Sequence, residues 1–424
     1  MKFILILLLL AITSSAQVKD SNDVLTLYMK STLDKLEQQK LINFINKKFK
    51  DVDLSKSDHR ARITRNKKGG GTAAWFMKAA SGSKLEIFAE KKRQWPMKEI
   101  GKSGLYFAAE KFPNWSSVHF HYTVNGKRFK HGKLHRFGFE SYTWTKDSLV
   151  QDVAPQGKVI NMGIYKATDE FYPGTERQWW VYLPKQYKKG LPVKLIVYND
   201  GRGFTRGVGN ACTVMDNLIH QGKMPVSIAV FVNPGIITRK GKSTISSRGN
   251  EYDTCLPKFA NFLEKEILSQ VFAKYTISPK AEDHAIVGAS SGGSCAFTAA
   301  WHRNDLFTKV ISFVGSFCDF RPINDYPLVK GLKSEHGPYK TAHDYPALIR
   351  KTNPAKNIRV FLQDGDNDLD NGLGNWFQNN LRMEAALAFS AYQHKAIWGK
   401  GMHSRKHGMA LLPEALEWLW ANKN

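Results

Sequence analysis

The hydrophobic positions along this chain of 424 residues change their spacing twice. Between Leu25 and Phe49, apolar residues recur at helical spacing among lysines and glutamines, which predicts an amphipathic helix. From residue 72 to residue 130 they form short runs of the kind found in β-strands. From residue 157 onward, apolar runs alternate with amphipathic segments, which is typical of a sheet covered by helices. The pattern therefore predicts a helical segment, an all-β domain and a larger α/β domain, in that order.

The all-β domain is expected over residues 67–135, and it begins at a hinge rich in lysine and glycine. Asn125-Gly126 follows one of its apolar runs, and this dipeptide is the strongest short signal for a β-hairpin. The predicted strands cover residues 72–79, 84–90, 104–109, 117–124 and 127–130. Such a set of strands forms a small β-sandwich.

Tryptophans of this domain are candidates for two roles. Trp75, Trp95 and Trp115 are expected in the core of the sandwich, since large aromatic side chains contribute most of a small core. If their rings are exposed, they offer flat apolar faces for stacking on sugars. Their burial therefore decides whether the domain has the means to bind carbohydrate.

The α/β domain is expected over residues 163–424, after a linker at residues 136–162. Its apolar runs are continuous, as in parallel strands that are buried on both faces. The predicted strands are residues 179–183, 195–199, 228–232, 285–287, 310–314, 358–363 and 395–398. The predicted helices are residues 212–220, 256–275, 295–303, 376–392 and 410–421. This alternation favours a mostly parallel sheet with helices on both faces.

The first residues of the chain have the layout of a signal peptide, predicted over residues 1–16. Lys2 precedes an apolar stretch at residues 3–12, and small residues lead to a cleavage site after Ala16. The apolar stretch is too short to span a bilayer, and the sequence contains no second run of spanning length. We therefore expect an exported protein, periplasmic or secreted, with no membrane span. Residues 17–66 would form its N-terminal helical segment.

Basic residues outnumber acidic residues by 62 to 37, which gives a formal net charge of +25. Such a charge attracts anionic partners over long distances. The lysines are spread along the chain, however, and the sequence contains no zinc-finger, helix-turn-helix or aromatic RNA-binding motif. We therefore expect no nucleic-acid partner, and an anionic substrate stays open.

The cysteines leave the redox state of the protein open. Cys212, Cys255, Cys295 and Cys318 all lie in the second half of the chain. Export would permit disulfides among them, and the sequence does not choose between three complete pairings and buried thiols. Their spacing matches no zinc motif. No metal and no cofactor are expected.

The candidate nucleophile is Ser290, which lies at the centre of the pattern Gly-x-Ser-x-Gly at residues 288–292. This pattern arises by chance roughly 0.1 to 0.2 times in a chain of this length, so its context must decide. A predicted strand ends at residue 287, and a helix rich in small residues begins at residue 294. A strand, a tight glycine-rich turn and a helix together form a nucleophile elbow.

A serine nucleophile needs a histidine base and a carboxylate, which follow it in that fold in the order serine, acid, histidine. The loop after strand 358–363 offers four carboxylates, of which Asp368 is favoured and Asp366 is the alternative. The loop after strand 395–398 offers His403, which is favoured over His407 because it comes directly after the strand.

Acyl transfer also needs N–H donors for the oxyanion that forms on the attacked carbonyl. One donor is expected to be the backbone N–H of Ser291, which follows the nucleophile. The second is expected in the loop after strand 195–199, where Gly201 and Arg202 are the candidates.

Together with motifs further upstream, these residues resemble the enterochelin esterase-like branch of the esterase D superfamily of α/β hydrolases. The matching segments are residues 177–184, 199–201, 215–219, 247–253, 288–293, the loop of Asp368, and residues 401–403. The resemblance implies an α/β-hydrolase domain preceded by an immunoglobulin-like sandwich. It implies Ser290, Asp368 and His403 as a catalytic triad, and Arg248 and Glu251 as a structural pair near the site.

The expected function is that of an exported serine carboxylic-ester hydrolase acting through an acyl-enzyme. Siderophore-type and carbohydrate-linked esters are the expected substrates, because relatives with this resemblance act on such compounds. Two alternatives use the same sequence features. The protein could be a carbohydrate-binding protein with an inactive hydrolase domain, or an acyltransferase on the same fold.

Overall fold

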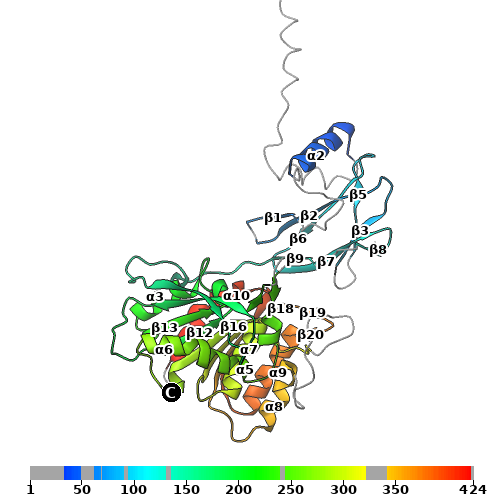
Figure 1. Ribbon diagram of the computed structural model, residues 1–424. Helices are drawn as coiled ribbons and strands as arrows, with labels where there is room; N and C mark the ends of the chain where they lie inside the picture. Colours follow the sequence, from blue (N-terminus) through cyan, green and yellow to red (C-terminus); the bar gives the residue numbers. More distant parts are fainter. Residues whose placement is uncertain are drawn as a thin grey trace, which may run out of the picture. The chain divides into compact units, whose positions relative to one another are not determined.

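The computed structural model describes residues 33–48, 62–67, 69–89, 94–129, 135–238, 244–320 and 341–421. The chain divides into two compact units between Ser141 and Tyr142 (Figure 1). The predicted signal peptide at residues 1–16 lies outside the described residues. None of the helices in the described ranges has the length and hydrophobicity needed to span a bilayer.

The first unit contains two antiparallel sheets that share one core. The first sheet has the order β1 (Arg62–Arg65), β2 (Gly71–Lys78), β6 (Leu105–Phe112), β5 (Lys98–Glu99). The second has the order β4 (Gln94–Pro96), β3 (Leu85–Ala89), β7 (Ser116–Val124), β8 (Lys127–Arg128), with β9 (His135–Phe139) also paired to β7. Trp75 of β2 and Phe120 of β7 meet between the sheets, with ring centroids 5.8 Å apart. The predicted sandwich is therefore present.

Two of the three candidate tryptophans, Trp75 and Trp95, pack in the core of this unit. Trp75 is fully buried, and Trp95 stacks on it with ring centroids 5.4 Å apart. Trp115 is partly buried in a turn with a positive φ of 65°. Trp75 therefore has no face to offer a sugar, and Trp95 uses one of its own faces for packing.

Strand β2 is buried on both faces because helix α2 (Lys35–Lys48) covers its outer side. Ala74 and Phe76 point toward the helix, where they pack with Leu41 and Ile45. Residues on the opposite face, such as Trp75, point into the sandwich. The helix predicted from Leu25 to Phe49 is thus found over its C-terminal part, and residues 25–32 lie outside the described residues.

The second unit is built on a sheet of ten strands among the described residues. Its order is β15-β14-β11-β13-β12-β16-β17-β18-β21, with β10 paired to β11. The strands are β10 (Lys158–Lys166), β11 (Glu176–Leu183), β12 (Lys194–Asn199), β13 (Ser227–Val232), β14 (Ile236–Ile237), β15 (Ile245–Ser246), β16 (His284–Ala289), β17 (Lys309–Phe313), β18 (Arg359–Asn367) and β21 (Gln393–Met402). The six strands from β13 to β21 in this order are parallel, whereas β10 and β11 pair antiparallel.

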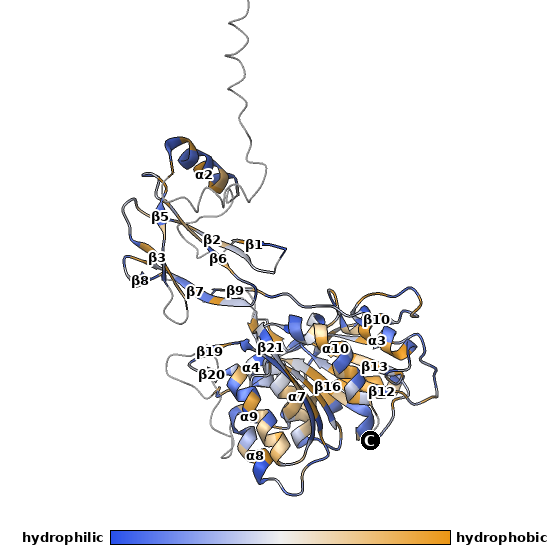
Figure 2. Cartoon of the chain, turned by 180° about the vertical axis from the view of Figure 1, so that it is seen from behind, coloured by the Kyte–Doolittle hydropathy of each residue, from blue (hydrophilic) through white to orange (hydrophobic). Residues whose placement is uncertain are grey.

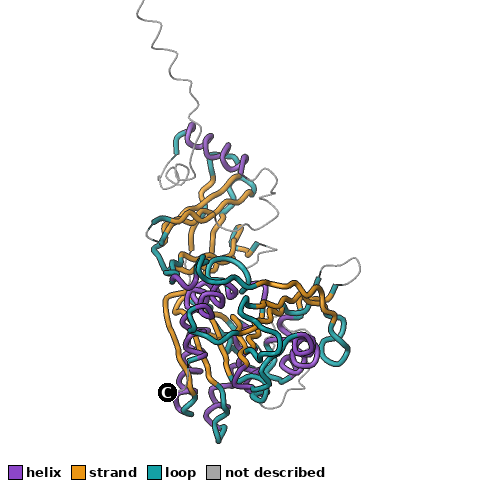
Figure 3. The backbone as a smooth tube through the Cα atoms, turned by 90° about the vertical axis from the view of Figure 1, so that its left-hand side faces the viewer, coloured by secondary structure: helices purple, strands orange, loops and turns teal. Residues whose placement is uncertain are grey.

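Helices cover both faces of this sheet (Figures 1 and 3). One face packs against α3 (Ala211–His220) and α10 (Arg405–Trp420). The other packs against α5 (Lys258–Phe262), the π-helical turn η4 (Leu263–Leu268), α6 (Ser269–Lys274), α7 (Ser291–His302), α8 (Tyr345–Lys351) and α9 (Trp376–Phe389). Shorter elements are η2 (Lys146–Ser148), η3 (Gly201–Gly203), α4 (Arg248–Tyr252), η5 (Ala281–Asp283), η7 (Ala342–Asp344) and the hairpin of β19 (Asp370–Asn371) and β20 (Gly374–Asn375). This is the expected α/β architecture.

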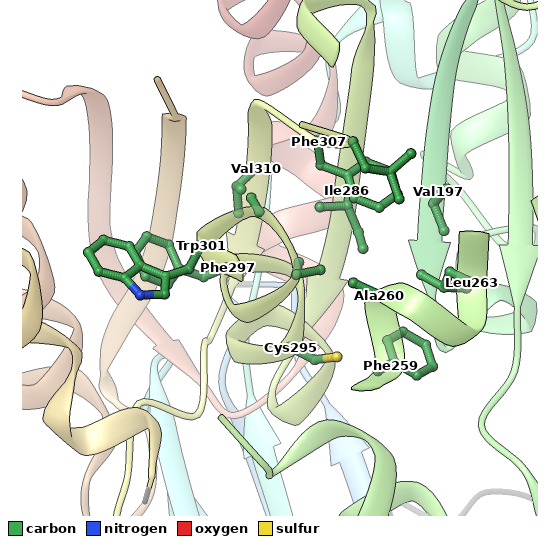
Figure 4. Packing of buried hydrophobic residues seen from close by; sticks show 14 of the residues in the cluster. Val197, Phe259, Ala260, Leu263, Ile286, Cys295, Phe297, Trp301, Phe307 and Val310 are labelled. Atoms are coloured by element: carbon green, nitrogen blue, oxygen red, sulfur yellow. The ribbon is translucent and has the colours of Figure 1, made fainter. Parts of the chain in front are cut away.

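Successive residues of the central strands enter the two cores in turn. Val197 of β12 and Ile286 of β16 belong to one core, and their chain neighbours Ile196 and Val287 belong to the other. Figure 4 shows Val197 and Ile286 above the helix that carries Leu263. The central strands are accordingly hydrophobic along their length (Figure 2), which explains their continuous apolar sequence.

The linker expected at residues 136–162 contains the boundary between the two units, and strands occupy both of its ends. His135–Phe139 form strand β9 of the sandwich, and Lys158–Lys166 form strand β10 of the large sheet. Strand β10 pairs with β11 alone and is largely exposed, so its sequence lacks the continuous apolar run by which the other strands were recognised.

The four cysteines, Cys212, Cys255, Cys295 and Cys318, are all buried and free. They therefore act as small apolar residues of the second unit, and none of them forms a disulfide.

Candidate active site

The turn between β16 and α7 holds Ser290 in a strained backbone conformation. Its φ of 60° and ψ of −131° are unusual for a residue with a side chain, and such a conformation costs about 1 to 3 kcal/mol. The Ser290 N–H donates to the carbonyl oxygen of Phe313 at 2.9 Å, which ties the turn to the end of β17. A Cβ on Gly288 would lie 2.0 Å from the carbonyl oxygen of Gly292. Glycine is therefore required where the strand and the helix cross, and the turn has the geometry of a nucleophile elbow.

Ser290, His403 and Asp368 form a continuous hydrogen-bonded series. Ser290 Oγ lies 2.7 Å from His403 Nε2, and His403 Nδ1 lies 2.7 Å from Asp368 Oδ1. The side chain of His403 is 10% exposed and that of Asp368 is fully buried. Burial of the carboxylate strengthens its interaction with the imidazole, because little water screens it.

The topology of the sheet explains how residues so far apart in sequence meet. Ser290 follows β16, Asp368 follows β18, and His403 follows β21. These strands are parallel and their carboxyl ends lie at one edge of the sheet. The site is therefore located where ligands bind in open α/β sheets.

The alternatives for the acid and the base have other partners. Asp366 is exposed, and its carboxylate accepts a hydrogen bond from Asn367 Nδ2 at 2.9 Å. His407 lies on α10, and its Nδ1 accepts a hydrogen bond from Gln363 Nε2 at 2.9 Å. Asp368 rather than Asp366 therefore contacts the histidine of the series, and His403 rather than His407 contacts Ser290.

A second carboxyl group, Asp364 of β18, interacts with the acid of this series and was only one of the four carboxylates that the sequence offered. Asp364 is fully buried, and its oxygens accept hydrogen bonds from the Gly365 N–H at 2.7 Å and from Asn380 Nδ2 at 2.8 Å. Burial, and after it the charge of Asp368, raises the pKa of Asp364 well above its usual range. Asp364 is therefore favoured as the neutral acid, and Asp368 carries the negative charge that faces His403.

The turn after β12 lies beside the nucleophile elbow. A Cβ on Gly292 would lie 2.9 Å from Asp200 Oδ2, so the two turns are in direct contact. Ser291 is the first residue of α7, where the backbone N–H has no intrahelical acceptor and the helix dipole is positive. Of the two candidates for the second donor, Arg202 uses its N–H to bond Asn233 Oδ1 at 3.0 Å. This hydrogen bond occupies the Arg202 N–H, which favours Gly201 of the two candidates.

The predicted pair of Arg248 and Glu251 does not form. Arg248 instead donates from Nε and Nη2 to the two carboxylate oxygens of Asp200, at 2.9 and 2.8 Å. Its Nη2 also contacts the carbonyl oxygen of Ala289 at 3.3 Å, so it joins the turn after β12 to the elbow. Glu251 pairs with Arg177 of β11 at 2.7 Å, and both of these side chains are fully buried. The short helix α4 directs its two charged residues to different partners.

Asp253 follows α4 and contacts the same region. Its side chain forms a hydrogen bond with Ser291, while its Oδ1 is buried and has no hydrogen-bond partner among the described residues. Burial raises the pKa of Asp253 to about 6, although the hydrogen bond to Ser291 and the charge of Arg248 act in the opposite direction. The carboxylate form of Asp253 is therefore disfavoured near the elbow.

Two further side chains contact the series and were missed from the sequence. Ser316 Oγ lies 3.2 Å from Ser290 Oγ, and Trp376 Nε1 donates to Ser316 Oγ at 2.9 Å. Ser316 comes just after β17, the strand next to the nucleophile's own strand, so the available signal was its place at the same sheet edge. Trp376 begins α9 and carried no such signal.

Within the described ranges, no three His, Cys, Asp or Glu side chains are grouped so that they could hold a metal ion.

A family model described as "Putative esterase" matches residues 172–419, which is more than half of the chain. The chain belongs to this esterase family. The matched segment contains every strand from β12 to β21 and the whole series of Ser290, Asp368 and His403. The esterase is accordingly a carboxylic-ester hydrolase. No curated protein is close enough in sequence to match it.

Solved structures share the fold of the esterase. Enterochelin esterase from Shigella flexneri is 16% identical, with a TM-score of 0.57 over 86% of this chain and 96% of that one. An enterobactin esterase from the same organism, solved in the presence of enterobactin, is 15% identical, with a TM-score of 0.54 over 86% and 96%. Ferric enterobactin esterase from Salmonella typhimurium is 15% identical, with a TM-score of 0.50 over 88% and 98%. The esterase therefore has the α/β-hydrolase fold, as the resemblance implied.

Proposed function

We propose that this esterase hydrolyses its substrates through a covalent acyl-enzyme on Ser290. The observation that carries the proposal is the series of two 2.7 Å contacts from Ser290 Oγ through His403 to Asp368. A serine hydroxyl is a poor nucleophile until a base removes its proton, and this series supplies the base and the group that orients it.

In the first half of the reaction, Ser290 Oγ attacks the ester carbonyl carbon while His403 Nε2 takes the hydroxyl proton. Asp368 holds the Nδ1–H of His403 and stabilises the imidazolium. The oxyanion that forms is bound by the N–H groups of Ser291 and Gly201. When the tetrahedral intermediate collapses, the bond to the alcohol breaks, and His403 gives its proton to the leaving oxygen.

In the second half, a water molecule attacks the acyl-enzyme and gives a proton to His403 Nε2. The new tetrahedral intermediate collapses, the acid is released, and the proton returns from His403 to Ser290 Oγ. Each step therefore moves one proton between His403 and one of Ser290, the leaving alcohol or the attacking water, and the triad ends in its starting state.

For the substrate, we infer a siderophore-type or carbohydrate-linked ester. Two considerations support this inference. Solved structures that share the fold include enterochelin and enterobactin esterases, one of them solved with enterobactin present. The formal net charge of +25 would draw an anionic ester to the protein.

We also infer that the esterase is exported and that its amino-terminal sandwich is an immunoglobulin-like domain. The first inference rests on residues 1–16 of the sequence, and the second on the two-sheet architecture of the first unit. Locating the protein by fractionation of the producing cell tests the first, since a protein retained in the cytoplasm with residues 1–16 intact contradicts it.

The serine mechanism is tested by hydrolysis of short p-nitrophenyl esters. Ser290→Ala should lower kcat/KM by at least about 10³-fold, because the nucleophile is lost. Ser294→Ala is the matched control, since Ser294 is a buried serine on the helix that follows the nucleophile, and its hydroxyl donates to the carbonyl oxygen of Ser291 at 3.1 Å. Equal rates for the wild type and Ser290→Ala would refute the mechanism.

The substrate class is tested by comparing enterobactin, acetylated sugars and feruloyl sugars at equal concentration. We expect at least one of these substrates to have a higher kcat/KM than p-nitrophenyl acetate, once the rates are corrected for the better leaving group of the p-nitrophenyl ester. Adding a sugar acceptor and analysing the products separates hydrolysis from acyl transfer. Acylated acceptor as the main product would replace the hydrolase with an acyltransferase.

A further inference from the structure

Ser316 places a second hydroxyl group against the nucleophile. It follows β17, and its N–H donates to the Ser290 carbonyl oxygen at 3.1 Å. Its Oγ lies 3.2 Å from Ser290 Oγ, and the residue is 1% exposed. Ser316 is thus fixed to the elbow by its backbone as well as by its side chain.

The donor and acceptor in the contact between the two hydroxyls follow from their other partners. Trp376 Nε1 can only donate, so at 2.9 Å it must donate to Ser316 Oγ. His403 directs Nδ1 to the carboxylate of Asp368, so Nδ1 carries the proton and Nε2 accepts. Nε2 therefore receives the single hydroxyl proton of Ser290 at 2.7 Å.

Ser290 Oγ has no second proton to give, so in its contact with Ser316 it can only accept. The hydrogen bonds then run in one direction, from Trp376 Nε1 to Ser316 Oγ, from Ser316 to Ser290 Oγ, and from Ser290 to His403 Nε2. The nucleophilic oxygen is held between a donor on one side and the base on the other.

We propose that Ser316 is a further catalytic residue, whose hydroxyl donates to Ser290 Oγ throughout the reaction, with Trp376 as the positioning residue that sets this direction. The inference rests on the proposed serine mechanism and adds a group to it. Ser316 transfers no proton. The proton of Ser290 still goes to His403, and the hydrogen bond from Ser316 persists on the oxygen that is left behind.

The contribution of Ser316 is greatest when Ser290 Oγ carries negative charge. This happens as the hydroxyl loses its proton during attack, and again as the oxygen leaves the acyl-enzyme in the second half of the reaction. A hydrogen bond to a charged oxygen is roughly twice as strong as one to a neutral oxygen. Ser316 therefore stabilises both transition states more than it stabilises the resting enzyme.

Trp376 has a second contact that keeps this arrangement rigid. Its ring meets the imidazole of His403 edge to face, with centroids 5.7 Å apart and an interplanar angle of 75°. The residue is 3% exposed. One buried side chain thus packs against the base and orients the hydroxyl beside the nucleophile.

The test compares Ser316→Ala, Trp376→Phe and the double variant, with kcat and KM for a p-nitrophenyl ester and the rate of fluorophosphonate labelling. Ser316→Ala should lower kcat and the labelling rate about tenfold with KM nearly unchanged, because the lost interaction belongs to the transition state. Trp376→Phe keeps the ring beside His403 and should lower kcat by a smaller factor. In the double variant the Trp376 change should have no further effect, because its N–H acts on Ser290 only through Ser316.

Several results would overturn the inference. The inference is wrong if Ser316→Ala keeps the wild-type kcat and labelling rate. It is also wrong if Trp376→Phe lowers kcat by the same factor in the wild type and in the Ser316→Ala background. Ser316→Thr keeps a hydroxyl and should recover most of the lost rate, whereas a merely structural role would not be restored by a bulkier side chain. If Ser316→Ala does not fold, Trp376→Phe decides alone, and an unchanged kcat refutes the proposal. Ser290→Ala at the wild-type rate would instead refute the proposed function.

Discussion

The assignment of Asp368 can be tested against Asp366, because the two carboxylates lie on the same loop and only one of them faces the histidine. Asp368→Asn removes the charge that lies 2.7 Å from His403 Nδ1 and leaves a side chain of nearly the same size. Asp366→Asn makes the same chemical change at an exposed position. The pair of variants therefore separates the effect of the triad charge from that of any charge on the loop.

The magnitude follows from the geometry. A nitrogen to oxygen distance of 2.7 Å places the centres of the imidazolium and carboxylate charges roughly 4 Å apart, where the interaction is about 4 kcal/mol at an effective dielectric constant of about 20. Its loss corresponds to about a 10³-fold lower rate. The amide of the Asp368→Asn variant can also donate to Nδ1, which would place the proton on Nε2 and prevent His403 from accepting from Ser290. We therefore expect a loss of about 10³- to 10⁴-fold.

The assay is kcat/KM for a short p-nitrophenyl ester, with circular dichroism to verify that both variants are folded. Asp366→Asn should stay within about twofold of the wild type, because an exposed charge contributes little. A large loss in Asp366→Asn with near wild-type activity in Asp368→Asn would show that the loop carries a different acid. Similar moderate losses in both would refute the calculation above.

Three further predictions concern the support of the site. Glu251→Gln should cost about 3 to 5 kcal/mol of unfolding free energy in a urea titration, because it leaves Arg177 buried without its charged partner; a loss below about 1 kcal/mol would contradict this. Asp253→Asn should stabilise the protein by about 3 kcal/mol near pH 7.5 and have little effect near pH 4. The pKa of Asp253 is about 6 in the folded protein, against an ordinary value of 3.8, so the folded state binds the proton more tightly than the unfolded state. The wild type therefore loses stability as the pH rises through this range, and the variant does not. Equal effects at both pH values would count against the raised pKa. Gly288→Ala should prevent folding or abolish activity, because its Cβ would lie 2.0 Å from the Gly292 carbonyl oxygen, so a soluble and fully active variant would disprove the close crossing.

The features that could be read from the sequence are those that local pattern and chain order determine. Central strands such as β12 and β16 have a continuous apolar sequence because they are buried on both faces. Ser290 follows β16 and Asp368 follows β18, which are strands of this kind, whereas His403 follows β21, the half-exposed strand at the end of the sheet order. Because the carboxyl ends of parallel strands share one edge of the sheet, the order of the chain was enough to place the three residues together.

The features that were missed depend on which distant segment a side chain meets. Arg248 and Glu251 are three residues apart on α4, yet their partners are Asp200 and Arg177, which no local pattern connects to them. Ser316 is an ordinary loop serine until β17 is placed beside β16. The edge strand β10 pairs with a single neighbour and is mostly exposed, so it does not have the apolar sequence of a core strand.

Under the proposed mechanism, Ser290 is the residue that is acylated during turnover. The most direct measurement is peptide mass spectrometry of the protein after reaction with a fluorophosphonate, with and without prior saturation by a slowly hydrolysed ester. We expect one adduct, on the peptide that contains Ser290, and its suppression by the ester. An adduct on a different residue, or ester hydrolysis that continues at full rate while Ser290 is unmodified, would contradict it.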